Sequence, residues 1–122
     1  MISPNYFDYA AATPMDPSVL SVMTPYFTDN FYNPSAQYLA AKGVAKDIKE
    51  ARESVARILG VRPGEVIFVA GGTEANNLAI KGIMTQYQNA EMLISSIEHA
   101  SISEPANDFS AKQVKVDHSG AV

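Results

Sequence analysis

The chain has 122 residues, of which 47% are hydrophobic and 18% charged, and its formal net charge is −4 at pH 7. Nine basic residues scattered along an acidic globular chain argue against a nucleic-acid partner or an anionic membrane surface. The absence of cysteine excludes disulfides and thiolate metal sites within these residues. Because no apolar run is long enough to span a bilayer and the N-terminus lacks the basic-then-apolar pattern of a secretory signal, we expect a cytoplasmic location.

The N-terminal part is predicted to be an arm followed by a helix and a loop. Residues 1–16 look like an extended arm that ends in a turn. Asp16-Pro17 combines an N-cap residue with a proline at the first helical position, and the following apolar residues recur at helical spacing. This pattern predicts a short helix that ends near Tyr26. Residues 30–35 contain Asn-Pro-Ser and are predicted to form a turn-rich loop.

The middle of the chain carries the strongest helical pattern. Residues 42–59 place apolar side chains on one face and charged side chains on the other, which predicts an amphipathic helix. Gly60 supplies a C-terminal stop, and residues 62–64 (Arg-Pro-Gly) turn the chain. The apolar run 66–70 is then predicted to be a buried strand.

The C-terminal part alternates helices and strands. A helix is expected to begin near Thr73, and the apolar runs 91–96 and 113–116 are predicted to be strands separated by a short helix. This order predicts an α/β fold with parallel strands, and we assign residues 17–122 to it. Residues 117–122 form a turn with no closing helix after it, so we expect the chain to be a fragment.

The junction between the predicted strand 66–70 and the next helix is a candidate anion site. Backbone N–H groups at a helix N-terminus lack intrahelical partners and carry the positive end of the helix dipole. Gly71 and Gly72 permit close approach, and the Thr73 hydroxyl can either cap the helix or bind a phosphate. An ordinary capped turn is the alternative. The segment lacks the P-loop and dinucleotide patterns, which argues against a nucleotide and leaves a cofactor with a single phosphate.

His99 is the second candidate site residue. It follows the predicted strand 91–96, and ligands of open α/β sheets collect beyond the carboxyl ends of the strands. An imidazole there can stack on an aromatic ligand or move protons, whereas a simple loop histidine is the alternative. Glu98 is not expected to form a dyad with it, because adjacent residues on an extended chain point to opposite faces. His99 and His118 are too far apart to suggest a zinc motif, so no metal is expected.

These residues together resemble a known family. The sequence is similar to the start of the cysteine desulfurases, which are pyridoxal-phosphate enzymes of the class V aminotransferase group. The similarity covers nearly the whole chain and lies in five blocks that keep the order and spacing of the family: Tyr6-Phe-Asp-Tyr-Ala-Ala-Ala-Thr-Pro-Met-Asp-Pro17, Asn33-Pro34-Ser35, Glu50-Ala51-Arg52, Gly71-Gly-Thr-Glu-Ala-Asn-Asn-Leu-Ala-Ile80 and Ile97-Glu98-His99.

The resemblance implies a fold and a reaction. The fold would be the N-terminal part of the large domain of a fold-type-I (aspartate aminotransferase-like) transferase, in a homodimer. The reaction would convert L-cysteine to L-alanine and leave a persulfide sulfur on the enzyme, for transfer to an acceptor protein. Gly72 and Thr73 match the residues that hold the phosphate of pyridoxal 5′-phosphate. His99 matches the histidine that stacks on the cofactor ring and is implied to move protons.

The same resemblance shows what these residues lack. No lysine here matches the family's cofactor-binding lysine, and no residue matches the acidic partner of the pyridine nitrogen. The family's sulfur-accepting cysteine and substrate-carboxylate arginine also lie beyond residue 122. We therefore expect this piece to be inactive by itself.

The sequence departs from the family pattern at three positions. Ala12, Tyr38 and Ala41 stand where the family commonly has threonine, histidine and glycine, which affects loop geometry and not the phosphate block.

The interpretation leaves two alternatives open. One alternative keeps the fold and changes the substrate, as in a selenocysteine lyase or another class V aminotransferase. The other is a truncated, non-catalytic interaction module that binds a partner through its apolar faces.

Overall fold

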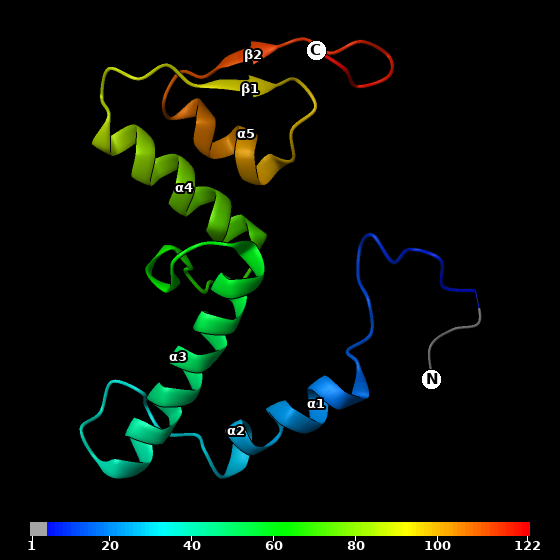
Figure 1. Cartoon of the computed structure of the whole chain (residues 1–122). Coiled ribbons are helices and arrows are strands. Elements are labelled where there is room, and N and C mark those ends of the chain that lie inside the picture. The colour runs from blue at the N-terminus through cyan, green and yellow to red at the C-terminus, as the bar shows by residue number, and fades with distance from the viewer. Residues whose placement is uncertain (1–4) are drawn as a thin grey trace. The chain divides into compact units, whose positions relative to one another are not determined.

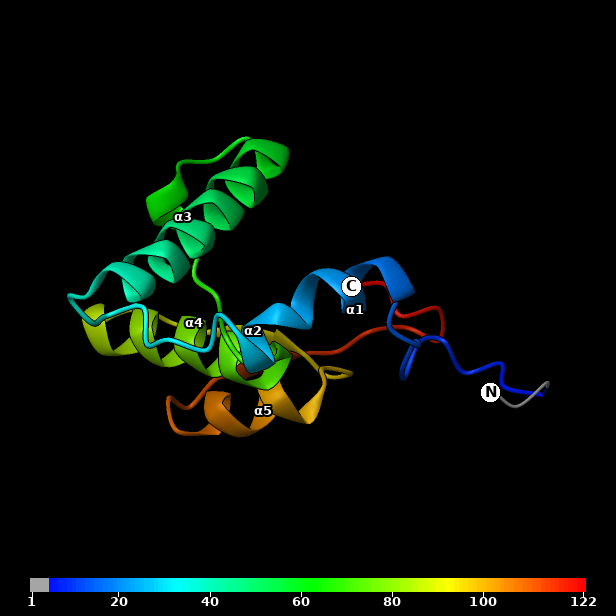
Figure 2. The same cartoon turned by 90° about the horizontal axis from the view of Figure 1, so that it is seen from below.

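The computed structural model describes residues 5–122, so the first four residues of the predicted arm lie outside the described part. The chain divides into two compact units, Met1–Val66 and Ile67–Val122, and each is described by itself below. Figures 1 and 2 show the elements of both units from two directions.

The arm has neither helix nor strand over residues 5–16, as the sequence predicts. The Tyr6 hydroxyl lies 2.8 Å from the carbonyl oxygen of Asp8 and 2.7 Å from that of Ala12. The Asp8 carbonyl also accepts hydrogen bonds from the amides of Ala11 and Ala12, at 3.1 and 3.3 Å. The arm therefore ends in a turn that is closed by its own backbone and by one tyrosine.

Two short helices follow where one is predicted. Helix α1 (Pro17–Met23) begins after Asp16, whose carboxylate accepts a 2.7 Å hydrogen bond from the Ser18 amide. Hydrogen bonds from the Ser18 hydroxyl and amide lower the pKa of Asp16. Helix α2 (Pro25–Thr28) starts afresh because Pro25 has no N–H to continue the α1 ladder. The predicted N-cap is thus confirmed, and the single helix is divided near its predicted end.

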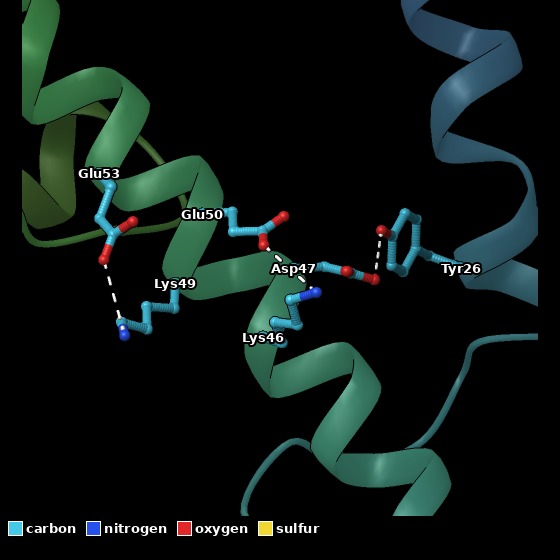
Figure 3. Close-up of polar contacts among 6 residues, drawn as sticks. All are labelled: Tyr26, Lys46, Asp47, Lys49, Glu50 and Glu53. Atoms are coloured by element: carbon cyan, nitrogen blue, oxygen red, sulfur yellow. Dashed lines mark hydrogen bonds and ion pairs between the residues drawn. The ribbon is translucent and has the colours of Figure 1, made fainter.

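Helix α3 (Leu39–Leu59) confirms the predicted amphipathic helix and begins three residues before the predicted start at residue 42. Its buried face carries Ala41, Val44 and Ala56. On its exposed face Lys46 pairs with Glu50 at 3.5 Å and Lys49 with Glu53 at 3.7 Å (Figure 3). Exposed pairs of this kind contribute little to stability, so burial of the small apolar residues holds this helix in place.

A tyrosine joins α2 to α3. The Tyr26 hydroxyl donates a 2.8 Å hydrogen bond to the Asp47 carboxylate, and the two side chains face each other across the gap between the helices (Figure 3). This bond raises the pKa of Tyr26, because the protonated hydroxyl is the donor. Val22, Ile48 and Ala51 line the same contact.

The end of α3 is fixed by Gly60 and a short 3₁₀ helix. Gly60 is in the left-handed conformation (φ 68°), and its N–H donates to the Ala56 and Arg57 carbonyls. The predicted turn becomes the 3₁₀ helix η1 (Pro63–Glu65). The Arg52 guanidinium returns from α3 to donate to the carbonyl oxygen of Val66. The last residue of the first unit is therefore held against α3, the longest helix of that unit.

The second unit is a small parallel α/β arrangement. It contains helix α4 (Gly72–Gln86), strand β1 (Leu93–Ser95), helix α5 (Ala100–Asn107) and strand β2 (Lys112–Val114). The strands are parallel, with Leu93 opposite Lys112 and Ser95 opposite Val114. Both helices lie on the same side of this two-stranded sheet (Figures 1 and 2). The predicted parallel strands and the short helix between them are confirmed.

The prediction of a buried strand over residues 66–70 is wrong. Val66 is buried and extended (φ −98°, ψ 122°), but within residues 5–122 no segment forms a sheet ladder with this run. Ile67 and Phe68 are 65% and 50% exposed. Apolar, β-branched sequence favours an extended backbone, but a strand also needs a neighbour, and the sequence pattern does not supply one.

The described residues bury few apolar side chains and expose many. The buried set is small: Ala41, Val44, Ala56, Val66, Ile94 and Ala106. By contrast Val22 and Phe27, in the first unit, are 71% and 70% exposed. None of the helices in residues 5–122 combines the length and the apolar character that a membrane span requires.

The conformation of Gly60 predicts opposite effects of two glycine substitutions in one helix. Gly60→Ala forces a Cβ into the left-handed region and should lower the free energy of unfolding by about 1 kcal/mol. Gly43→Ala lies inside α3, where an added Cβ meets nothing within 4 Å, and should raise it by about 0.5–1 kcal/mol. Urea unfolding followed by circular dichroism measures both, and equal effects would contradict the assigned helix end.

Candidate functional site

The N-terminus of α4 lacks a capping side chain. Gly71 is the N-cap residue, with an extended backbone (φ 174°, ψ 177°), and no side-chain hydrogen bond caps the helix there. Of the two roles open to the Thr73 hydroxyl, capping the helix or binding a phosphate, the structure does not show capping. Thr73 is the second residue of the helix, whereas capping requires a side chain on the residue before the first turn. Its hydroxyl is left available for a ligand.

Glu74 stabilises the approach to this helix. Its carboxylate accepts a 2.7 Å hydrogen bond from the amide of Ala70, one residue before the N-cap. The contact resembles the return half of a capping box, in which an acidic side chain of the first turn binds the amide ahead of the helix. It also places a negative charge near the positive end of the helix dipole. Glu74 thus holds the entering chain while the first helical amides stay open.

The backbone N–H groups of Gly72 and Thr73 find no acceptor among residues 5–122. Both glycines before Thr73 are open, since a Cβ added at Gly71 or Gly72 would meet nothing within 4 Å. An anion can therefore come close to the amides. The arrangement has the requirements of a phosphate-binding helix N-terminus: unpaired donors, a favourable dipole and no obstructing side chain.

His99 lies just past the carboxyl end of β1, as the sequence indicates, and is the N-cap residue of α5. Its Nδ1 accepts a hydrogen bond from the Ser101 amide at 3.1 Å and lies 2.8 Å from the Ser101 hydroxyl oxygen. An amide N–H can only donate, so Nδ1 is the acceptor and the ring proton resides on Nε2. His99 is therefore more than a simple loop histidine, because its side chain caps the N-terminus of α5.

A hydrogen bond joins α4 to α5 beside this histidine. The side-chain amide of Asn76 donates to the Ser101 hydroxyl oxygen at 2.9 Å, in a partly buried position. Because Ser101 accepts from Asn76, its own proton is free to point to His99 Nδ1. Asn77 has a different role, since its side chain donates to the Thr73 carbonyl at 3.0 Å inside α4. Asn76, Ser101 and His99 thus form one polar chain across the two helices.

Thr73 and His99 line the same hollow, which lies between α4 and α5 and has a volume of about 470 Å³. The other residues that line it are Asn77, Lys81, Ala100, Ser101, Glu104, Pro105 and Asp108. Gly72 is adjacent to Thr73 but does not line the hollow. The structure therefore brings two of the three predicted site residues to one concavity and places the third at its edge.

The hollow is polar at both ends. Thr73 and His99 mark the end at the helix N-termini, and Lys81, Glu104 and Asp108 mark the other. Its size lies in the range of small-molecule sites, which run from about 300 to 1,000 Å³. The arrangement suits a flat molecule with one anionic group, which the amides of α4 would bind while the imidazole lies against the ring.

Sequence reasoning missed Ser101 as a partner of His99, and it missed the contact of Asn76 with Ser101. The spacing of His99 and Ser101 is that of an N-cap residue and the second helical residue, so the pattern carried a usable signal. The contact of Asn76 with Ser101 joins residues 25 positions apart. No local pattern encodes that contact, because it depends on how α4 and α5 pack.

The fold and the hollow define an α/β segment with an uncapped helix N-terminus beside a histidine that follows a strand. Residues 5–121 match the model of the family described as aminotransferase class V, and the chain belongs to that family.

Individual relatives agree with this assignment. The chain is 39% identical over 121 residues to "Cysteine desulfurase IscS" of Rickettsia bellii (strain OSU 85-389), covering 97% of this chain and 30% of that protein. It is 36% identical over 124 residues to the protein of the same name from Dictyoglomus turgidum (strain DSM 6724 / Z-1310), covering 96% and 32%. A solved "NIFS-like protein" superposes with a TM-score of 0.81 at 29% identity, covering 91% of this chain and 32% of that one. The chain thus spans about a third of the length of these relatives.

The contact between Glu74 and Ala70 predicts a difference between two substitutions. Glu74→Ala removes the acceptor of the Ala70 amide and should lower the free energy of unfolding by about 0.5–1 kcal/mol. Glu74→Gln keeps a side-chain oxygen at the same position and should retain most of that stability. Thermal unfolding of the two variants beside the unsubstituted protein measures the difference, and an Ala variant as stable as the Gln variant would contradict this role.

Proposed function

We propose that the chain is the N-terminal portion of a pyridoxal-phosphate-dependent cysteine desulfurase that acts as a cytoplasmic homodimer. The observation that carries this proposal is the shared hollow, in which the open N-terminus of α4 and His99 meet. The aminotransferase class V family, to which the chain belongs, generally uses pyridoxal phosphate. The desulfurase activity is proposed from the relatives that bear this name.

The residues of the hollow fit the phosphate of this cofactor. The open amides of Gly72 and Thr73 and the unused Thr73 hydroxyl are three donors on one helix turn. Hydrogen bonds to a charged acceptor are stronger than neutral ones, and the helix dipole adds to them. Glu74 does not compete for these donors, because its carboxylate is bound to the Ala70 amide.

His99 fits the aromatic ring of the cofactor. Its Nδ1 is bound in the plane of the imidazole by Ser101, so the faces of the ring remain available for stacking. Its Nε2 carries the proton and is the ring nitrogen left for another partner. When bound, pyridoxal phosphate supplies an electron sink for the amino acid substrate. His99 would hold the ring and offer a hydrogen-bond donor at Nε2.

The remaining machinery would come from residues outside this chain. Within residues 5–122 Lys81 is the lysine that lines the hollow, and it does not match the family's cofactor-binding lysine. The exposed apolar side chains of both units support further packing partners: Val22, Phe27, Ile58 and Ile83 are examples. We propose that the rest of the protein and a second subunit cover such faces, and that a sulfur acceptor protein receives the persulfide sulfur from L-cysteine.

Reductive trapping tests the cofactor proposal. Borohydride treatment of the complete protein with pyridoxal phosphate should give a stable lysine adduct, located by peptide mass spectrometry outside residues 1–122. Lys81→Arg should leave this adduct intact. Thr73→Ala should weaken pyridoxal phosphate binding about tenfold or more because one charge-assisted hydrogen bond is lost, whereas Thr73→Ser should retain it. Pyridoxal without phosphate should bind both Thr73 variants equally. No adduct, or an adduct on Lys81, would overturn the proposal.

The substrate is tested separately. The complete protein should convert L-cysteine to alanine and release sulfide in the presence of a thiol reductant. Faster conversion of selenocysteine would favour the selenocysteine lyase alternative. Trapped cofactor without conversion of either substrate would indicate another class V aminotransferase. A chain that binds no cofactor and stays monodisperse and protease-resistant would instead support the interaction module.

A further inference from the structure

We propose that Ser101, oriented by Asn76, is a positioning residue that holds His99 in the Nε2–H tautomer and fixes the plane of its ring. This inference deepens the proposed function and rests on it for its catalytic meaning. The structural part rests on three contacts: Asn76 to Ser101 at 2.9 Å, and the hydroxyl and amide of Ser101 to His99 Nδ1 at 2.8 and 3.1 Å.

The direction of these hydrogen bonds follows from the chemistry of the groups. The Ser101 amide has one proton and no acceptor function, so it can bind Nδ1 only when that nitrogen is unprotonated. The Ser101 hydroxyl accepts from the Asn76 amide, which leaves its own proton for Nδ1. Two donors from one residue therefore converge on a single ring nitrogen and favour the neutral tautomer with its proton on Nε2.

The same contacts fix the orientation of the ring. The lone pair of Nδ1 lies in the plane of the imidazole, so two donors on Ser101 restrain rotation about the bond to the ring. Ser101 belongs to the first turn of α5, and Asn76 ties that turn to α4, which carries Thr73. The position of His99 is thereby coupled to the helix that would bind the phosphate. A ligand that binds both the N-terminus of α4 and His99 meets a ring that is already oriented.

A tautomer fixed in this way limits what His99 can do. The neutral ring presents Nε2–H as a hydrogen-bond donor, whereas Nδ1 is occupied. His99 would therefore begin a catalytic cycle as a donor at Nε2 and not as a base at that atom. Because loss of the Nε2 proton from the neutral ring would leave an imidazolate, His99 would act through Nε2–H as a hydrogen-bond donor to a bound group, and Ser101 would hold the ring in place.

Nitrogen NMR of the cofactor-free complete protein, labelled with [15N]histidine, tests the tautomer. The His99 signals, assigned by their loss in His99→Gln, should show a protonated Nε2 and an unprotonated Nδ1 at a pH where the ring is neutral. Ser101→Ala removes the hydroxyl donor and keeps the amide donor, so both signals should shift part of the way toward the average of the two tautomers, and Ser101→Thr should restore the original positions. Ser103→Ala is the matched control, since Ser103 lies on the same helix and its amide donates to the His99 carbonyl.

Two substitutions of Asn76 test the direction of the chain. Asn76→Ala removes a donor but leaves the Ser101 proton directed to His99, so the signals should stay close to their original positions. Asn76→Asp replaces the donor with an acceptor, so the Ser101 proton should turn to the new carboxylate and the His99 signals should shift as in Ser101→Ala. If Asn76 only held the two helices together, the Ala and Asp variants should affect the His99 signals in the same way.

Binding and turnover complete the test. Ser101→Ala should weaken pyridoxal phosphate binding or lower kcat about threefold to tenfold, the range expected for one neutral hydrogen bond, and Ser101→Thr should recover the loss. A wild-type His99 with its proton on Nδ1, or unchanged signals in both Ser101→Ala and Asn76→Asp, would overturn the inference. Failure of the proposed function would appear differently, as an absent lysine adduct in a protein whose His99 tautomer is as described.

Discussion

The convergence of the α4 N-terminus with His99 is the constraint on which the site depends. Two backbone amides at a helix start are a general feature, and so is a histidine after a strand. They become one site because α4 packs against α5 and the Asn76–Ser101 hydrogen bond ties their first turns together. That packing and that hydrogen bond together hold the amides of α4 and the imidazole next to each other.

In this site, some polar atoms are occupied by internal hydrogen bonds and neighbouring ones are left open for a ligand. Glu74 binds the Ala70 amide before the helix, so the next amides remain open for a ligand. Ser101 occupies Nδ1 of His99, so the faces and the Nε2 atom of the ring remain open. In both cases a neighbouring polar group satisfies one atom and leaves an adjacent one available. Such preorganisation lowers the cost of binding because few groups must be ordered when a ligand arrives.

The exposed apolar surface gives the context for this site. Both units leave large side chains in contact with solvent, among them Phe27 and Ile67. The chain spans about a third of the length of its relatives, and the family assignment rests on residues 5–121. Under the proposed function, the hollow would be one wall of a larger site that the proposed lysine, cysteine and second subunit would complete.

The sequence by itself determined the elements that depend on local chemistry: the Asp16 cap of α1 and the amphipathic helix α3 with its Gly60 stop. It also indicated Gly72, Thr73 and His99 as site residues, and their roles stay predictions. Capping, periodicity and glycine conformation act over a few residues and can be read from neighbours in the chain. Tertiary structure decided which extended segments pair, so that Leu93–Ser95 is a strand and residues 66–70 are not. It also decided that Asn76 meets Ser101, because contacts between distant residues depend on helix packing and not on local pattern.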